Sequence, residues 1–288
     1  MKIVLTPNPY RDKQFRVALQ AERILHESGA KTVLCLPFDV DKDYEIPAGI
    51  ELGDLDQQMQ DADMLICFGG DGTILHASKI ATAHKIPVLG VNIGTLGFIA
   101  ELEAGELELL RKIPKGDYTV ETRSMIDVTV RNEKQELFHE TALNDAVITK
   151  GAIARVVQIS ICCDDVEATS FSGDGVILCT PTGSTAYSMS AGGPIIEPSA
   201  RNLLITPICA HAMLAKSIVV GPRRVITVKL GKVSRNNAFL SVDGGRSFRL
   251  NSGDVVTAKN SEQVTQLVRL KNTSFFEILN KKFIGKQR

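Results

Sequence analysis

Two glycine-rich segments, each with one carboxylate, are the residues best suited to chemistry in this sequence. Gly69–Thr73 (GGDGT) directly follows the apolar run Met64–Phe68, and Gly173–Gly175 (GDG) leads into the polar stretch Thr180–Tyr187. Small residues let a ligand approach the backbone closely, so that N–H groups can face an anion. A carboxylate beside that anion can activate a hydroxyl group. Together the two segments point to phosphoryl transfer onto a nucleotide.

The first segment predicts a phosphate loop made of Gly69, Gly70, Gly72 and Thr73. A helix that begins here would offer unpaired N–H groups and the positive end of its dipole. The segment is not a Walker A loop, because no Gly-Lys-Ser/Thr follows, and it is not GxGxxG. Asp71 could orient and deprotonate an attacking hydroxyl. The alternative is a strand-to-helix turn in which Asp71 only caps the helix, and GGDGT alone supports both equally.

Other segments carry weaker signals. Gly90–Phe98 has several glycines and an aromatic residue that could stack on a base, although a loop that buries the aromatic explains it better in isolation. Asn144-Asp145 interrupts a strand pattern, as at a ligand site or, somewhat more often, a solvent-facing edge. Arg155 could bind a phosphate, but a lone arginine in a β-rich region is usually solvated. Asp243–Gly245 predicts a hairpin turn.

The stretch Thr180–Tyr187 is the most specific one. The strand Val176–Cys179 enters a Pro/Gly turn, and a helix is expected at about Ser184–Ala191. Its hydroxyl groups are neutral donors and acceptors that suit ribose and phosphate. A capped helix with incidental hydroxyls is the alternative, but the preceding Gly173–Gly175 favours a functional site. The hydroxyl-bearing residues are Ser184, Thr185, Tyr187, Ser188 and Ser190.

Composition and charge describe an ordinary globular chain. Its 288 residues suggest about two domains, with 44% hydrophobic and 23% charged residues. Lys plus Arg equals Asp plus Glu at 33 each, which gives no reason to expect nucleic acid or an anionic membrane as a partner. No apolar run approaches the length of a membrane span, and the start resembles a strand rather than a signal peptide. We therefore expect a cytoplasmic protein.

The cysteines and histidines predict neither disulfides nor a metal centre. Most of the six cysteines lie in or beside apolar runs, without a CxxC pair, which favours buried free thiols. The five histidines are scattered along the chain. No His-x-x-x-His pair falls on an expected helix, so a histidine-ligated metal is not expected.

The spacing of apolar residues divides the chain into an α/β part and a β-rich part. Up to residue 123, continuous apolar strands alternate with helices, which predicts a Rossmann-like α/β domain with a parallel sheet. Ligands in such sheets bind at the carboxyl ends of the strands, where GGDGT falls. Residues 124–271 carry short β-branched runs separated by turn residues and predict an antiparallel, β-sandwich-like domain. A C-terminal helix at about 272–288 is expected to pack back on the first domain. The expected strands of the first domain are Ile3–Leu5, Lys31–Leu36, Met64–Phe68 and Pro87–Val91.

Five segments together resemble the bacterial NAD kinases in order and spacing, over nearly the whole chain. GGDGT alone is shared with other kinases of the same superfamily, whereas TPTGSTAYSMSAGGPI is far more selective. The matching segments are Gly69–Thr73, Gly90–Phe98, Ala142–Ile148, Gly173–Ile196 and Pro207–Val220.

The resemblance implies ATP-dependent phosphorylation of the adenosine 2′-hydroxyl of NAD to give NADP. Asp71 matches the general base of the family, and Phe98 and Arg155 match ligand-contacting positions. The resemblance also implies Mg²⁺ carried with ATP, NAD bound in a cleft between the domains, and a homodimer or homotetramer assembled through the β-rich domain. The remaining NAD-site positions implied are Gly72, Asn144, Asp145, Asp174, Thr185, Ala186, Tyr187, Ser188, Met189 and Ser190.

Three residues depart from the pattern of many family members. Asp145 stands where many have Glu, Gly245 where many have Gln, and Ser172 where some have Arg. The rival functions are a lipid or other small-molecule kinase of the GGDGT superfamily, a non-catalytic dinucleotide sensor and a nicotinamide dehydrogenase. No base pocket can be recognised in the sequence, which predicts loose selectivity for the phosphoryl donor.

Overall fold

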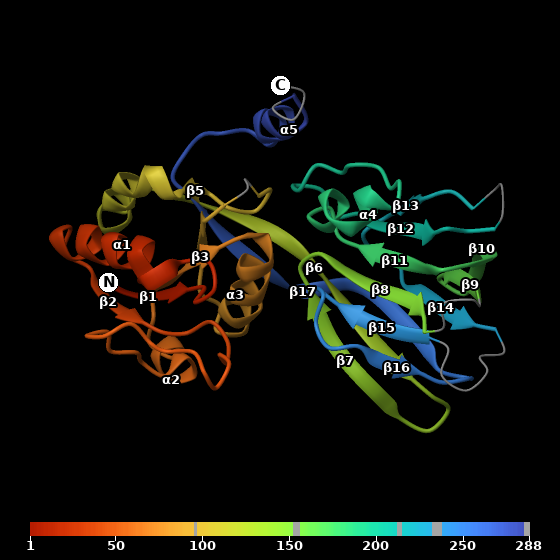
Figure 1. Cartoon of the computed structure of the whole chain (residues 1–288). Coiled ribbons are helices and arrows are strands. Elements are labelled where there is room, and N and C mark those ends of the chain that lie inside the picture. Colours follow the sequence, from red (N-terminus) through yellow and green to blue (C-terminus); the bar gives the residue numbers. More distant parts are fainter. Residues whose placement is uncertain (95–96, 152–155, 212–214, 232–237, 285–288) are drawn as a thin grey trace. The chain divides into compact units, whose positions relative to one another are not determined.

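The computed structural model describes residues 1–94, 97–151, 156–211, 215–231 and 238–284 (Figure 1). The chain forms two compact units, one of residues 1–122 with 265–288 and one of residues 123–264. Two strands, β6 (Thr119–Arg131) and β17 (Val255–Arg269), run from one unit into the other. The boundary between residues 264 and 265 therefore falls inside a continuous strand.

The first unit is built on a parallel sheet. Its strands are β1 (Lys2–Pro7), β2 (Lys31–Leu34), β3 (Met64–Gly69) and β4 (Val88–Asn92). They lie in the order β2-β1-β3-β4, and each neighbouring pair is parallel. The carboxyl ends of β1, β2 and β3 thus share one edge of the sheet.

Each face of this sheet is covered, which explains why its strands are apolar without alternation. Ile3, Leu5 and Ile66 pack with α1 (Arg16–Glu27) and the 3₁₀ segment η2 (Ala104–Lys115). Residues next to them in the strands, such as Val4, Leu65 and Cys67, form a second core on the other face. That core includes Met59 of α2 (Leu55–Met59) and the buried side of α3 (Asp71–Ala83).

The C-terminal segment belongs to the first unit. The end of β17 pairs with β4 at Leu267 and Val88, and α5 (Phe275–Ile284) follows. On α5, Lys281 Nζ lies 3.0 Å from Glu103 Oε1 in β5 (Leu102–Glu103). The short segment η1 (Lys13–Phe15) precedes α1.

The second unit contains an antiparallel sheet in which the described residues form the order β13-β12-β11-β8-β15-β16. Strand β8 lies at its centre and pairs Cys179 of β11 with Asp145, and Val242 of β15 with Ala146. The bounds are β8 (Asp145–Lys150), β11 (Gly175–Cys179), β12 (Leu203–Ile208), β13 (Ile218–Val220), β15 (Ala238–Val242) and β16 (Phe248–Leu250).

Further antiparallel strands supply the rest of the second unit. They are β7 (Glu136–Ala142), β9 (Val157–Cys163), β10 (Val166–Gly173), β14 (Ile226–Leu230) and parts of β6 and β17. One apolar core includes Val128, Ile148, Ile159, Leu178 and Val256, which come from five different strands. The predicted α/β and β-rich halves are therefore both confirmed.

Two sequence expectations are wrong in detail. The helix expected at 184–191 is instead a 3₁₀ turn, η3 (Gly183–Thr185), and one turn of α-helix, α4 (Tyr187–Ser190). Ala186 separates them because its φ of −102° and ψ of −128° are not helical. All six cysteines are free, but Cys209 is exposed rather than buried because it lies just beyond the end of β12. Within the described part of the chain, the helices are too short and polar to cross a bilayer.

Candidate active site

The GGDGT loop connects β3 to α3 in the first unit. Gly70 is the N-cap residue of α3 and has extended backbone angles, so the alternative in which Asp71 caps the helix is wrong. The Asp71 carboxylate instead accepts hydrogen bonds from Phe98 N at 2.9 Å and from Ile99 N at 3.4 Å. The loop after β4 thus holds this half-buried carboxylate by two backbone N–H groups.

Two glycines are required by their neighbours. A Cβ atom at Gly97 would lie 1.8 Å from Asp71 Oδ1, and one at Gly69 would lie 2.3 Å from Thr73 Oγ1. Both distances are shorter than any real contact, so a side chain at Gly97 would displace the Asp71 carboxylate. Gly97 therefore belongs to the site, because the absence of a side chain there leaves room for the Asp71 carboxylate.

A cavity of about 620 Å³ lies in front of the loop, and we call it the phosphate cavity. Beside Gly70–Thr73 it is lined by Asn8, Arg11, Phe38 and His76. Asn8 Nδ2 donates to Thr73 Oγ1 at 2.8 Å. A Cβ atom on Gly70 would lie 3.3 Å from Arg11 Nη1, which places the guanidinium over the loop backbone. The cavity combines a cation with the N-terminus of a 13-residue helix and suits an anion.

Asn8 and Arg11 were not recognised in the sequence. Both follow β1, and β1 lies beside β3 in the sheet, so their side chains reach the loop that follows β3. The polar run directly after the first strand was the available signal, because the carboxyl ends of parallel strands share one edge.

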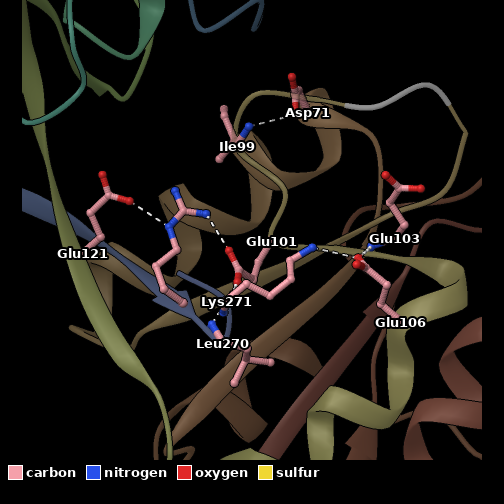
Figure 2. A network of polar contacts seen from close by, with 9 residues as sticks. Asp71, Ile99, Glu101, Glu103, Glu106, Glu121, Leu270 and Lys271 are labelled. Carbon is pink, nitrogen blue, oxygen red and sulfur yellow. Dashed lines mark hydrogen bonds and ion pairs between the residues drawn. The ribbon is translucent and has the colours of Figure 1, made fainter. Parts of the chain in front are cut away.

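A network of ion pairs anchors the loop that holds Asp71 (Figure 2). The carboxylate of Glu101 is buried and accepts from Leu270 N and Lys271 N, each at 2.8 Å. Arg269 Nη1 lies 3.1 Å from Glu101, and its Nε donates to Glu121 at 2.7 Å. Because Glu101 lies two residues beyond Ile99, the C-terminal segment fixes the position of the backbone that binds Asp71.

The network continues to η2. Lys271 Nζ donates to Glu106 Oε2 at 2.8 Å, and the same oxygen accepts from Glu103 N. The Nζ atom of Lys282 lies 4.0 Å from the centroid of the Phe98 ring, a cation–π distance. Phe98 therefore has two roles in the first unit, since its N–H binds Asp71 and its ring contacts α5.

In the second unit, Asn144 and Asp145 lie at the start of β8. The carboxylate of Asp243 accepts from three consecutive N–H groups: Leu143 and Asn144, each at 2.8 Å, and Asp145 at 3.0 Å. Asp243 also has a φ of 47° in the turn between β15 and β16. The sequence predicted only the hairpin turn here and missed this positioning role.

Asp145 is buried close to a second carboxylate. Burial, followed by the charge of Asp243, raises the pKa of Asp145 from 3.8 to about 7. Near neutral pH the side chain is therefore partly protonated, and it can either donate or accept a hydrogen bond. Such a perturbed buried carboxyl is typical of a functional site.

Asn144 is packed against the TPTGS turn. Thr180 N donates to Asn144 O at 2.9 Å, and a Cβ atom on Gly183 would lie 2.2 Å from that same oxygen. The side chain of Asn144 is 7% exposed, and its Oδ1 is a buried atom without a partner in the described residues. Because buried polar atoms are normally paired, this oxygen points to a ligand.

Most hydroxyls of the second motif are already used within the protein. Ser184 Oγ donates to Pro181 O at 2.6 Å, Thr185 Oγ1 donates to Thr182 O at 3.0 Å, and Ser188 Oγ lies 2.8 Å from Thr206 Oγ1. Tyr187 and Ser190 are exposed, and Ala186 and Met189 are half-buried. The exposed hydroxyls are therefore the ones best placed to meet a ligand.

Asp174 lies away from the other predicted residues of this unit. It follows β10, and its carboxylate accepts from Lys150 Nζ at 2.7 Å. Lys150 ends the strand that Asp145 begins, so the Cα atoms of these two residues are roughly 17 Å apart at about 3.4 Å per residue. Within the second unit the fold does not bring Asp174 together with Asn144 and Asp145.

The glycines beside Asp174 serve strand packing. A Cβ atom on Gly175 would lie 2.1 Å from Ile148 O, and one on Gly173 would lie 2.9 Å from Ile208 O. The N–H of Asp174 donates to Ile208 O. The suggestion that this backbone faces a ligand is therefore wrong for Asp174 N. Arg155 lies outside the described residues.

The first unit combines a carboxylate with the N-terminus of a helix, and the second presents a buried amide oxygen that has no partner among the described residues, beside a carboxyl of raised pKa. Groups of these kinds suit a phosphotransferase that acts on a hydroxyl group. Residues 4–118 match the family model of the ATP-NAD kinase N-terminal domain, and residues 143–270 match that of the ATP-NAD kinase C-terminal domain. The chain belongs to the ATP-NAD kinase family, and it transfers a phosphoryl group to NAD.

Named relatives agree with this assignment. The NAD kinase of Caldanaerobacter subterraneus subsp. tengcongensis is 37% identical over 282 residues, 98% of each chain. That of Carboxydothermus hydrogenoformans is 40% identical over 234 residues, 81% of this chain and 83% of its own. The crystal structure of yeast NADH kinase complexed with NADH has a TM-score of 0.85 at 25% identity and covers 99% of this chain and 87% of its own.

A second solved structure supports the fold. An NAD kinase from Archaeoglobus fulgidus in complex with ATP has a TM-score of 0.73 at 23% identity, and the match covers 99% of this chain and 98% of that chain.

Proposed function

We propose that Asp71 is the general base that activates the adenosine 2′-hydroxyl of NAD. The observation that carries this role is the pair of hydrogen bonds from Phe98 N and Ile99 N, which orient the carboxylate at the edge of the phosphate cavity. Asp71 accepts the hydroxyl proton as the oxygen attacks the terminal phosphorus of the donor. The bond from that phosphorus to its bridging oxygen breaks, and NADP and the nucleoside diphosphate leave.

The donor phosphates occupy the phosphate cavity in this proposal. Arg11 neutralises their charge, and the N–H groups at the start of α3 bind their oxygens. Asn8 holds Thr73 in place through its amide group. ATP as the donor is supported by the family description and by the Archaeoglobus fulgidus NAD kinase, whose structure is a complex with ATP.

A divalent cation fits this site as a companion of the donor. Among the described residues there is no cluster of three or more His, Cys, Asp or Glu side chains that could hold a metal. Mg²⁺ usually binds through substrate phosphates with one or two carboxylates, and Asp71 is the carboxylate at the cavity. Bound there, Mg²⁺ would neutralise charge on the phosphate oxygens.

The residues proposed to bind NAD form two groups. Some offer a polar group to a ligand, and the others are placed in the site by the family pattern. Asn144 offers the unpaired Oδ1, and Tyr187 and Ser190 offer exposed hydroxyls. Asp145 offers a carboxyl of raised pKa that suits a ribose hydroxyl. Phe98, Gly72, Thr185, Ala186, Ser188, Met189, Asp174 and Arg155 remain part of the proposed NAD site on the strength of the family pattern.

Assembly into a homodimer or homotetramer is part of the proposal. In the second unit β13 is an edge strand of its sheet, and its Val219 is 49% exposed. Unpaired edges and exposed apolar side chains favour association. Light scattering at micromolar concentration should therefore find a dimer or tetramer, and a fully active monomer would contradict this.

The central experiment is incubation of the purified protein with NAD, ATP and Mg²⁺, followed by measurement of NADP. Formation of NADP at a rate that saturates with both substrates is the expected result. The matched control omits Mg²⁺ and adds a chelator, which should abolish the reaction. Binding of NAD without any NADP formation would favour a dinucleotide sensor instead.

A further inference from the structure

The loop that binds Asp71 is joined to the C-terminal segment through one buried side chain, Glu101 (Figure 2). Its carboxylate is 6% exposed and accepts from Leu270 N and Lys271 N, each at 2.8 Å. The Arg269 guanidinium, itself only 14% exposed, lies 3.1 Å from the same carboxylate. Removal of a buried acceptor leaves its donors unpaired, so this contact is costly to break.

The loop backbone lies directly against the Asp71 carboxylate. Phe98 N and Ile99 N donate to it, and a Cβ atom on Gly97 would lie 1.8 Å from Asp71 Oδ1. Glu101 follows Ile99 by two residues, and its own N–H donates to a carbonyl of β4 at 2.9 Å. A displacement of this short loop therefore moves the carboxylate with it.

The helix α5 makes two further contacts near the loop, and both are weaker. Lys281 Nζ lies 3.0 Å from Glu103 Oε1, but the two side chains are 68% and 47% exposed. Lys282 Nζ lies 4.0 Å from the centroid of the Phe98 ring. Exposed ion pairs and exposed cation–π contacts each contribute about 1 kcal/mol or less. The position of the loop thus depends most on the buried Glu101.

We propose that Glu101 is a positioning residue for phosphoryl transfer. It acts through the backbone of Phe98 and Ile99, which orients the Asp71 carboxylate toward the attacking hydroxyl. The inference rests on the proposed function, since it requires Asp71 to be the general base. A misplacement of a reacting group by about 1 Å can lower a rate about 100-fold, so loss of Glu101 affects kcat rather than substrate binding.

The first test exchanges single carboxylates for amides. Glu101→Gln keeps an oxygen for the two N–H groups, but its NH₂ group then meets the Arg269 guanidinium, so that two donors face each other. This variant should lower kcat about tenfold and leave KM for NAD and for ATP within about twofold. Glu106→Gln is the matched control, because Glu106 accepts from Lys271 Nζ at 2.8 Å in the same network but lies in η2, outside the loop. It should leave kcat within about twofold.

A second measurement separates positioning of Asp71 from a general loss of structure. Single-turnover rates are compared for Asp71→Asn with and without Glu101→Gln. Without a general base to misplace, the added substitution should change the rate less than about twofold. An equal tenfold loss in both backgrounds would overturn the proposal, because Glu101 would then act independently of Asp71.

A further variant keeps the test decisive if Glu101→Gln fails to fold, as judged by urea denaturation. Arg269→Lys retains the charge but cannot contact Glu101 and Glu121 together, and it should lower kcat about threefold at unchanged KM values. An unchanged kcat in a folded variant of either residue would overturn the positioning role. Near-normal turnover of Asp71→Asn alone would instead contradict the proposed function, so the two failures can be told apart.

Discussion

The GGDGT loop and the segment around Asn144 each hold a carboxyl group in place, but they do so through different contacts. In the first unit Asp71 is half-buried and faces a cavity, and backbone N–H groups of a neighbouring loop hold it. In the second unit Asp145 is buried, and another carboxylate, Asp243, organises the backbone on which it lies. The first arrangement leaves the carboxylate of Asp71 facing a cavity, whereas the second raises the pKa of Asp145 and leaves Asn144 Oδ1 without a partner among the described residues.

This difference shows that the length of a motif does not measure the number of its ligand contacts. GGDGT is short, yet its carboxylate and the start of α3 line a cavity. The longer stretch Thr180–Ser190 uses most of its hydroxyls to stabilise its own turn. A specific sequence pattern can therefore indicate a turn that needs particular side chains to form, and not only a binding surface.

The largest effect is expected at the open carboxylate. Asp71→Asn should lower kcat by about 10²–10⁴-fold, because the amide keeps the shape of the side chain but cannot accept the proton. The Kd for NAD, measured by calorimetry, should change less than about threefold. Near-normal turnover in this variant would exclude Asp71 as the general base.

The next prediction tests whether the first unit binds ATP and the second unit binds NAD. Arg11→Ala should raise KM for ATP by about 10–100-fold, since a charge-assisted contact to phosphate is lost, with little change in KM for NAD. Lys13→Ala, which removes an exposed cation outside the cavity lining, is the matched control and should behave as wild type. A larger effect on NAD than on ATP would reverse the assignment of the two regions.

Asp243→Ala tests the organising carboxylate of the second unit. Three N–H groups lose their acceptor, so the free energy of unfolding should fall by about 2–4 kcal/mol. KM for NAD should rise about tenfold while KM for ATP stays within about twofold. Urea denaturation and steady-state kinetics measure the two effects, and an unchanged KM for NAD would separate the turn from the binding site.

Smaller effects are expected from residues that each offer one polar group. Asn144→Ala should raise KM for NAD about fivefold, and Tyr187→Phe about twofold, both more than KM for ATP. Ser184→Ala is the control, because the Ser184 hydroxyl makes its hydrogen bonds within the turn. Its loss should lower the free energy of unfolding and leave the affinity for NAD unchanged. Equal changes in both KM values would indicate a structural role for Asn144 and Tyr187.

The pH dependence of stability tests the raised pKa of the buried Asp145 carboxyl. The pKa of Asp145 is higher in the folded state, so the folded protein binds a proton between about pH 4 and 7 that the unfolded chain releases. The contribution of Asp145 to stability is present below pH 4 and is lost as the pH rises to 7. Asp145→Asn should match wild type near pH 4 and exceed it by about 1–3 kcal/mol at pH 8 in urea denaturation. A constant difference across this range would contradict the raised pKa.

The elements with regular patterns could be predicted from sequence. The four strands of the first sheet and the helix after GGDGT have long apolar patterns, and they lie within a few residues of their expected positions. β10 was missed because polar residues break up the apolar run of Val166–Gly173 and four of its eight residues are exposed, which weakens the hydrophobic signal. The helix expected at 184–191 failed because hydroxyl-to-backbone hydrogen bonds compete with helical ones.

The candidate site was predictable where a motif marked it and unpredictable where tertiary contacts created it. Asp71 and Asn144 stand in recognisable segments. Arg11, Gly97 and Asp243 gain their roles only because strands distant in sequence become neighbours. The separation of Asp174 from Asp145 follows from the antiparallel register of β8 and β11, which no single-residue pattern encodes.

The anchoring of Glu101 by Arg269–Lys271 sets an order of events during protein synthesis. The ribosome makes residues 1–122 first, but the segment that anchors the Asp71-binding loop emerges only after the whole second unit. A nascent chain that has completed the parallel sheet still lacks that anchor, and contacts spanning such sequence distances form late and slowly. The Asp71-binding loop can therefore be anchored only after the second unit has been translated.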